Sequence, residues 1–179
     1  MRPERGSASV ASRPLTAFVL AGGASLGAMQ AGMLRALYER GIVPDLLVGT
    51  SAGALNAAFV ASRPQTVETA DQLARVWHEL RREHIFPLSL RALLVGLSGN
   101  RDHLVPDGGL RRLVARHIEF ADLGDAAVPL HVVAFDLTAN CEVLLSCGPT
   151  VDVITAAASI PGIFPPVPIA GRSLASIRQ

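Results

Sequence analysis

The chain has 179 residues, of which 50% are hydrophobic and 17% are charged, so it can bury the core of one folded domain. Its formal net charge is +1 and its sixteen basic residues are spread along the chain, which argues against a nucleic-acid partner. Its two cysteines, Cys141 and Cys147, cannot supply a four-ligand zinc site and fit a reducing compartment. We therefore expect a cytoplasmic domain without a metal or a cofactor.

The N-terminal end divides into two parts. Residues 1–13 are rich in arginine and serine and are interpreted as a disordered leader, so the folded domain is expected over residues 14–179. Residues 14–34 carry no charge, but four glycines and several polar side chains make this stretch too polar for a membrane span. A strand, a loop and a helix account for it better.

Two strand-loop-helix units fill the next part of the chain, and such units are typical of a parallel sheet covered by helices. The expected order is a strand at 16–21, a loop at 22–27, a helix at 28–41, a strand at 45–48, a loop at 49–53 and a helix at 54–61. We therefore predict an α/β fold with a mainly parallel central sheet flanked by helices.

The remaining elements are predicted from hydrophobic periodicity. Helices are expected at 66–83, 88–97, 109–117 and 150–159, and strands at 129–137 and 142–146. The segment IPGIFPPVPI that follows is assigned no strand.

A serine stands between two glycines after the second predicted strand, in the segment Gly49, Thr50, Ser51, Ala52 and Gly53. This G-x-S-x-G pattern is typical of a nucleophile elbow, where a strained turn between a strand and a helix exposes the serine. The N–H groups at the start of the following helix would face the reacting centre. An ordinary turn of small residues is the alternative.

The loop GGASLG at 22–27 also lies between a strand and a helix. It is no dinucleotide-binding fingerprint, because Ala24 breaks the glycine spacing and the second strand ends in Gly49 instead of an acidic residue. It is no P-loop, because no lysine follows its last glycine. The backbone N–H groups of Gly23 and Ala24 can converge on a developing negative charge, which indicates an oxyanion hole, with a simple tight turn as the alternative.

The segments FVLAGGASLGAMQAGMLRAL and PDLLVGTSAGALNAAF resemble the bacterial patatin-like phospholipases, in which a glycine-rich oxyanion loop precedes a G-x-S-x-G elbow. The similarity extends to LHVVAFDL and ITAAASIPGIFPPVPIAGR, and so covers residues 15–172.

This resemblance implies a three-layer patatin-like fold and a lipid acyl hydrolase, in which Ser51 is the nucleophile of a Ser-Asp dyad that uses no histidine. Lipid or ester substrates and transient contact with a membrane surface are implied as well, whereas the oligomeric state stays open. The oxyanion hole would be lined by Gly22, Gly23 and Ala24, and the oxyanion loop would be completed by Ser25, Leu26 and Gly27.

The chain departs from the family pattern at two positions. Ala24 stands where the family usually has a glycine, and we expect its methyl group to be tolerated only if the residue keeps a negative φ. The family's catalytic aspartate belongs to a D-G-[GA] motif shortly after a Gly-Arg pair. Here Gly171 and Arg172 are followed by SLASIRQ, so Ser176 falls near the aspartate position and no catalytic aspartate is identified. This pattern indicates a truncated or frame-shifted member with an incomplete domain.

Other candidate bases receive structural interpretations. Asp107 begins the single D-G-G of the chain but precedes an amphipathic helix, where it is expected to be an N-cap. Asp136 ends a predicted strand and is interpreted as a structural carboxylate. His117 ends a helix, where a cation would suit the helix dipole. No pair of histidines has the helical spacing of a metal site.

Three hypotheses about the function remain open. The leading hypothesis is a patatin-like serine acyl hydrolase that cleaves ester bonds of phospholipids or other lipids, with activity impaired by the missing aspartate. The second is a lipid-binding remnant without catalysis. The third is a conventional α/β-hydrolase esterase with an unrecognised histidine.

Overall fold

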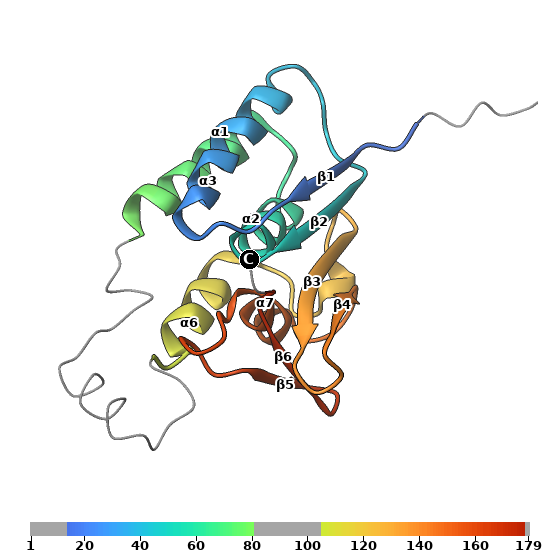
Figure 1. Ribbon diagram of the computed structural model, residues 1–179. Coiled ribbons are helices and arrows are strands. Elements are labelled where there is room, and N and C mark those ends of the chain that lie inside the picture. Colours follow the sequence, from blue (N-terminus) through green and yellow to red (C-terminus); the bar gives the residue numbers. More distant parts are fainter. Residues whose placement is uncertain (1–13, 81–104, 178–179) are drawn as a thin grey trace, which may run out of the picture.

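The computed structural model describes residues 14–80 and 105–177 (Figure 1). The expected leader at 1–13 and the expected helix at 88–97 lie outside these residues. The elements are, in chain order, β1 (Ala17–Leu20), η1 (Ala24–Leu26), α1 (Gly27–Tyr38), β2 (Leu46–Thr50), α2 (Ala52–Ala61), α3 (Val67–Glu79), α6 (Gly108–His117), η2 (Leu123–Asp125), β3 (Leu130–Asp136), β4 (Cys141–Leu145), α7 (Thr150–Ala158), β5 (Val167–Ile169) and β6 (Arg172–Ala175).

Most predicted elements are confirmed. Both strand-loop-helix units lie where they were expected, as do α6, α7 and the strands β3 and β4. The helix expected at 66–83 is α3, which ends at Glu79 within the described residues. The segment expected to hold no strand ends in β5, and β6 follows after a tight turn. β5 escapes a prediction from sequence because it has three residues and contains Pro168, which cannot donate to a sheet.

The α/β fold is confirmed, with a sheet that is parallel in its first half and antiparallel in its second. β1, β2 and β3 are parallel neighbours, as the two strand-loop-helix units predict. β4 and β6 both pair antiparallel with β3, and β5 pairs antiparallel with β6. Figure 1 shows β4 and β6 on opposite sides of β3.

The strands β2 and β6 share one edge of β3. β4 pairs with β3 along residues 132–136, so the pairings of β2 with residues 130–133 and of β6 with residues 135–136 must use the other edge. β2 runs parallel to β3 and β6 antiparallel, so the two strands run toward each other. Thr50 lies opposite Val133 and Ala175 opposite Phe135, which leaves only Ala134 between the two register positions.

The helices form two further layers over the sheet. α2 and α7 pack directly on the strands, while α1 and α3 pack on each other and on the outside of α2 (Figure 1). The sheet face covered by α2 carries a row of buried side chains in register, Phe18, Leu47 and Leu130. On the opposite face Val19 is 71% exposed. Among the described residues no helix is long and apolar enough to cross a membrane.

The alanine-rich helix α2 is buried on nearly all sides because it lies between the sheet and the outer helices. Nine of its ten residues are buried, and most of them are small apolar residues. Small side chains let a helix approach a sheet closely, which brings the start of α2 against the ends of the first two strands. This close approach positions the candidate site.

Candidate active site

Ser51 occupies a strained turn between β2 and α2. Its backbone has φ 51° and ψ −125°, a region that few residues other than glycine adopt. The glycines on either side are required because a side chain at either position would clash with the backbone of a neighbouring segment. A Cβ atom at Gly49 would lie 2.6 Å from the Cα atom of Ala54, and one at Gly53 would lie 1.9 Å from the carbonyl oxygen of Leu20. The G-x-S-x-G pattern therefore has the geometry of a nucleophile elbow.

The hydroxyl group of Ser51 does not cap the helix that follows. Serine at this position commonly accepts a hydrogen bond from a backbone N–H of the first turn, but the Ser51 side chain makes no such bond. Only the carbonyl oxygen of Ser51 takes part in the hydrogen bonding of the helix, where it accepts from the N–H of Ala54 at 3.0 Å. Ser51 is a half-buried residue, and its hydroxyl group is not used in capping the helix.

The glycine-rich loop lies beside the elbow. Leu20 and Gly49 are partners in the parallel pairing of β1 and β2, so the two loops leave the same edge of the sheet at the same level. The loop turns sharply at Gly23, with φ 143°, and at Ala24, with φ 49°. The condition under which the methyl group of Ala24 was expected to be tolerated, a negative φ, is therefore not met. A hydrogen bond of 2.9 Å from the N–H of Leu26 to the carbonyl oxygen of Gly23 closes the turn and imposes this conformation.

The end of the loop touches the first residue of α2. A Cβ atom at Gly27 would lie 2.9 Å from the Cβ atom of Ala52 and 2.8 Å from the indole ring of Trp77. Because Gly27 has no side chain, the end of the glycine-rich loop packs closely between α2 and α3. This packing fixes the distance between the glycine-rich loop and the elbow.

A polar network that the sequence analysis missed joins the same elements. The Nδ2 group of Asn56 donates to the carbonyl oxygen of Gly27 at 2.9 Å and to Oε1 of Gln30 at 2.8 Å. Nε1 of Trp77 donates to Oδ1 of Asn56 at 2.8 Å, and Nε2 of Gln30 donates to the carbonyl oxygen of Ala21 at 2.8 Å. An asparagine inside an otherwise apolar helix is the signal that could have indicated Asn56.

Ser176 lies at the C-terminal end of β6, where that strand meets the end of β2. Extending each register by one residue brings both Ser51 and Ser176 level with Ala134 on the same edge of β3. Ser176 is 3% exposed, and its N–H donates to the carbonyl oxygen of Ser159 at 2.8 Å. Position 176, which the sequence places near the family's catalytic aspartate, therefore follows β6 at the level of the sheet at which the elbow follows β2.

Comparison with known proteins identifies the family. The sequence profile of the patatin-like phospholipases matches residues 18–176, which is most of the chain. The chain belongs to the patatin-like phospholipase family. Among curated proteins it is similar to the neuropathy target esterase sws of Drosophila melanogaster, with 28% identity over 152 residues, and to that of Drosophila persimilis, with 27% identity over 150 residues. Each match covers 83% of this chain but only 10% of the relative.

The fold of this patatin-like chain is also found in a solved structure. VipD from Legionella pneumophila superimposes with a TM-score of 0.62 at 15% sequence identity, over 90% of this chain and 45% of the VipD chain. The three-layer patatin-like fold expected from the sequence is thereby confirmed.

Asp107 does not act as the expected N-cap of α6. It stands before the helix, but its backbone is already helical and its side chain caps no N–H group. Its carboxylate instead pairs with Nε of Arg111 at 2.6 Å, and Nη1 of Arg111 lies 2.6 Å from Oδ1 of Asp152 on α7. The two carboxylates raise the pKa of Arg111. Arg111 therefore joins α6 to α7 and Asp107 holds Arg111 from the start of α6, which agrees with the interpretation of Asp107 as a structural residue.

Asp136 has the structural role that the sequence indicates. It is 3% exposed, and its Oδ1 accepts hydrogen bonds from the N–H groups of Thr138 at 2.9 Å and Ala139 at 3.0 Å. The carboxylate thus closes the turn between β3 and β4.

Two of the described histidines, His117 and His131, have surroundings that the structure defines. The expectation that His117 suits its helix end as a cation is wrong, because burial, together with the nearby charges of Arg116 and Arg63, lowers its pKa. Nδ1 of His131 lies 2.5 Å from the hydroxyl oxygen of Ser146. Among the described residues no hydrogen bond joins a histidine to Ser51.

Two cavities lie beside the helices of this patatin-like domain. The larger, of about 420 Å³, is lined by Val76, Glu79, Leu80, Gly109, Arg112, Leu113, Arg116 and His117. The smaller, of about 60 Å³, is mainly apolar and includes Leu55, Asn56 and Trp77 in its wall. Ser51 lines neither cavity, but the smaller one begins one helical turn beyond Ser51 on α2.

Proposed function

We propose that this chain carries a patatin-like serine acyl hydrolase site that cleaves ester bonds of phospholipids or other lipids, with Ser51 as the nucleophile. The backbone of Ser51 is the observation that carries the proposal. A strained φ and ψ at a strand-to-helix turn costs stability, and such strain is typical of functional residues. The esterase name of the curated relatives supports an ester substrate.

The proposed reaction begins when Oγ of Ser51 attacks the ester carbonyl carbon. The carbonyl π electrons move to oxygen and form a tetrahedral oxyanion. The backbone N–H groups of Gly22, Gly23 and Ala24 are proposed to donate to this oxyanion, and the N-terminus of α2 adds a favourable dipole. The carbonyl re-forms as the C–O bond to the alcohol oxygen breaks, and that oxygen takes up the proton that Ser51 released. An acyl group is left on Ser51, and water removes it as the free acid in a second round of the same steps.

The hydroxyl proton of Ser51 needs an acceptor during the attack. In the family the acceptor is the aspartate of the D-G-[GA] motif, and Ser176 stands near that place in this chain. A serine hydroxyl takes no proton at neutral pH. We therefore propose that Ser51 reacts slowly here and that a carboxylate at position 176 restores the dyad.

The test is covalent labelling of the purified chain with a fluorophosphonate probe. We expect slow labelling of the unmodified chain and none of Ser51→Ala or of heat-denatured protein. Ser176→Asp should accelerate labelling on the order of a hundredfold, the usual contribution of a positioned general base. Ser173→Asp, the same change on the same strand away from the junction with β2, is the matched control and should leave the rate unchanged.

Each outcome separates the three hypotheses. If neither the unmodified chain nor Ser176→Asp is labelled while both unfold cooperatively, the lipid-binding remnant is favoured and the hydrolase proposal fails. If labelling is fast without Ser176→Asp and is lost in a histidine-to-alanine variant, the conventional esterase is favoured instead.

A further inference from the structure

Asn56 has a hydrogen-bond partner for each polar atom of its side chain beside the glycine-rich loop. The residue is 1% exposed, both hydrogens of its amide group are donated, and its oxygen accepts from the indole N–H of Trp77. A buried amide that is fully satisfied has one favourable orientation, because any rotation leaves a polar atom unpaired. Asn56 is therefore a fixed point on α2, five residues after Ser51.

The network of Asn56 reaches both ends of the loop. One hydrogen bond goes directly to the carbonyl oxygen of Gly27, where the loop ends. The other passes through Gln30 to the carbonyl oxygen of Ala21, immediately before the loop begins. The segment between these two anchors contains the two residues with positive φ, Gly23 and Ala24.

A strained loop keeps its conformation only when its surroundings impose it. Ala24 lies in the left-handed region, which is unfavourable for a residue with a Cβ atom. The anchors at Ala21 and Gly27 supply the constraint from outside the loop. They also tie the loop to the helix that carries Ser51.

We infer that Asn56 is a positioning residue, whose hydrogen bonds hold the backbone N–H groups of the oxyanion loop at a fixed place relative to Ser51. The inference rests on the proposed function, since it assigns these N–H groups to the oxyanion. It goes beyond that function by naming the residue that sets the geometry of the hole.

Gln65 provides a matched control. It is also a side-chain amide with three hydrogen bonds, which it makes to the hydroxyl group of Tyr38 and to the carbonyl oxygens of Val60 and Arg63. These bonds lie at the other end of α2 and do not reach the loop. Gln65→Leu therefore removes a comparable set of bonds from the fold without releasing the loop.

The first test compares fluorophosphonate labelling at saturating probe, in the unmodified chain and in the Ser176→Asp background. We expect Asn56→Leu to lower the maximal labelling rate at least tenfold and to leave the half-saturating probe concentration unchanged, since misplacement of an oxyanion donor affects the chemical step. Gln65→Leu should keep the rate within twofold. Gln30→Met removes the anchor at Ala21 and the hydrogen bond between Gln30 and Asn56, but it keeps the bond from Asn56 to the carbonyl oxygen of Gly27. This variant should show an intermediate loss, and it tests the proposal even if the Asn56 variant fails to fold.

The second test needs no activity. We expect Ala24→Gly to raise the denaturation midpoint of the unmodified chain and to raise it less in Asn56→Leu, because a released loop no longer imposes the positive φ. Trp77 is the single tryptophan of the chain, so its emission reports the network directly.

The outcomes distinguish the two proposals. If Ala24→Gly raises the denaturation midpoint equally in the unmodified chain and in Asn56→Leu, the role of Asn56 is overturned, whatever the labelling rate of Ser51. Labelling at Ser51 that is as fast in Asn56→Leu as in the unmodified chain overturns it as well. Absence of labelling in every background defeats the proposed function, while a reduced effect of Ala24→Gly still supports Asn56 as the residue that holds the loop.

Discussion

Two residues of the candidate site carry backbone strain that the rest of the fold must offset. Ser51 and Ala24 both have positive φ, and a left-handed conformation costs a residue other than glycine roughly 1–2 kcal/mol. Asn140 and Ala170 also have positive φ and, like Ala24, they are exposed. Ser51 and Ala24 differ from them in place, because they lie in the two loops that leave the same edge of the sheet at the candidate site.

Ala24→Gly is predicted to stabilise the chain by about 1 kcal/mol, since the relief of the left-handed strain exceeds the extra entropy of glycine in the unfolded chain. Urea denaturation measures the change. Ala170→Gly, at a residue with φ 48°, is the control and should stabilise the fold similarly without altering the labelling of Ser51. A loss of stability in Ala24→Gly would show that the alanine methyl group contributes more by packing than it costs by strain.

At the residue scale the sequence predicts the elbow but not the conformation of the loop. The glycines beside Ser51 reveal the turn, because a local pattern demands it. The positive φ of Ala24 is set by the hydrogen-bonded turn and by the anchors of Asn56, which bonds to a carbonyl group 29 positions earlier in the chain. No local pattern contains such a contact.

At the scale of the element, two glycines of α1 have opposite roles. Gly32 lies on the exposed side of the helix, and a Cβ atom there would meet nothing within 4 Å. Gly27 is buried between Ala52 and Trp77, where a Cβ atom would clash. Only the second glycine is required by packing.

We predict that Gly32→Ala stabilises the chain by roughly 0.8–1 kcal/mol, the difference in helix propensity between the two residues. Gly27→Ala is predicted to destabilise it and to slow the labelling of Ser51, because the loop must move away from α2. Chemical denaturation of both variants and labelling of the folded samples check the pair. If Gly27→Ala kept the stability and the labelling rate, the close packing of loop and elbow would be unimportant.

The elements themselves differ in how far the sequence predicts them. β1, α1, β2 and α2 follow from alternating hydrophobic runs and glycine-rich turns that are complete within each segment. β6 has four residues and is stabilised by pairing with β3, which lies more than thirty positions earlier. That pairing, and with it the level of Ser176 in the sheet relative to Ser51, is a property of the sheet and not of the segment.

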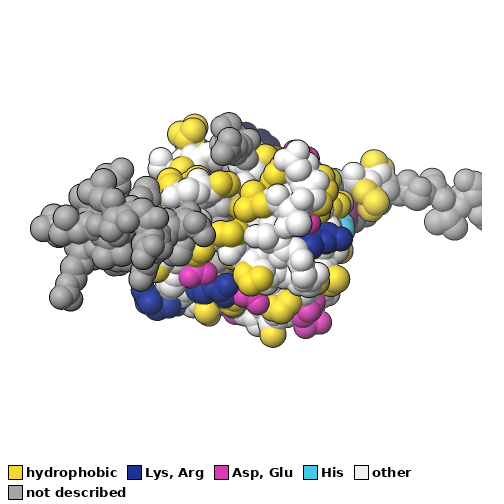
Figure 2. All heavy atoms as spheres, turned by 60° about the horizontal axis from the view of Figure 1, so that its bottom comes forward, with side chains coloured by type: hydrophobic (Ala, Val, Ile, Leu, Met, Phe, Trp, Pro, Cys, Tyr) yellow, Lys and Arg dark blue, Asp and Glu magenta, His cyan; other side chains and the backbone are white. Residues whose placement is uncertain are grey.

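At the scale of the whole molecule, acidic and basic side chains are mixed on the surface, and some ion pairs connect elements that are distant in the chain. Figure 2 shows one face on which basic and acidic side chains lie close together, and the net charge of the chain is +1.

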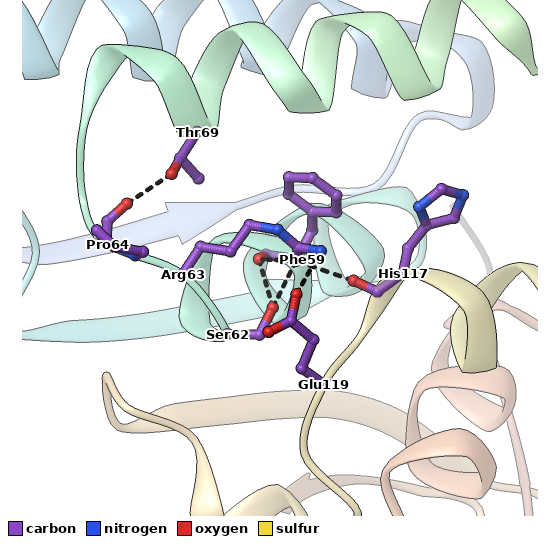
Figure 3. A network of polar contacts seen from close by, with 7 residues as sticks. All are labelled: Phe59, Ser62, Arg63, Pro64, Thr69, His117 and Glu119. Atoms are coloured by element: carbon purple, nitrogen blue, oxygen red, sulfur yellow. Dashed lines mark hydrogen bonds and ion pairs between the residues drawn. The ribbon is translucent and has the colours of Figure 1, made fainter.

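Arg63, which follows α2, connects the end of α2 to the end of α6 and to Glu119 beyond it (Figure 3). Its guanidinium group stacks over the ring of Phe59 at 3.9 Å, donates to the carbonyl oxygen of His117 at 2.9 Å and pairs with Glu119 at 3.0 Å.

This junction leads to a prediction about pH. Burial of His117 and the charges of Arg116 and Arg63 lower its pKa from 6.5, so the folded chain binds a proton at His117 less readily than the unfolded chain does. The unfolded chain then holds more protons below pH 6.5, and the free energy of unfolding falls as the pH decreases through this window. Above pH 6.5 both states are neutral at this residue and the contribution is constant.

We expect His117→Gln to lose less stability than the unmodified chain between pH 7.5 and pH 5.5, because the glutamine does not titrate. Thermal unfolding of both proteins across this range gives the difference directly. Arg116→Gln removes one repelling charge from an exposed position, so its loss of stability should begin as in the unmodified chain but reach a smaller total. Parallel curves for the unmodified chain and His117→Gln would mean that His117 binds its proton equally well in both states, and that the junction between α2 and α6 does not respond to pH.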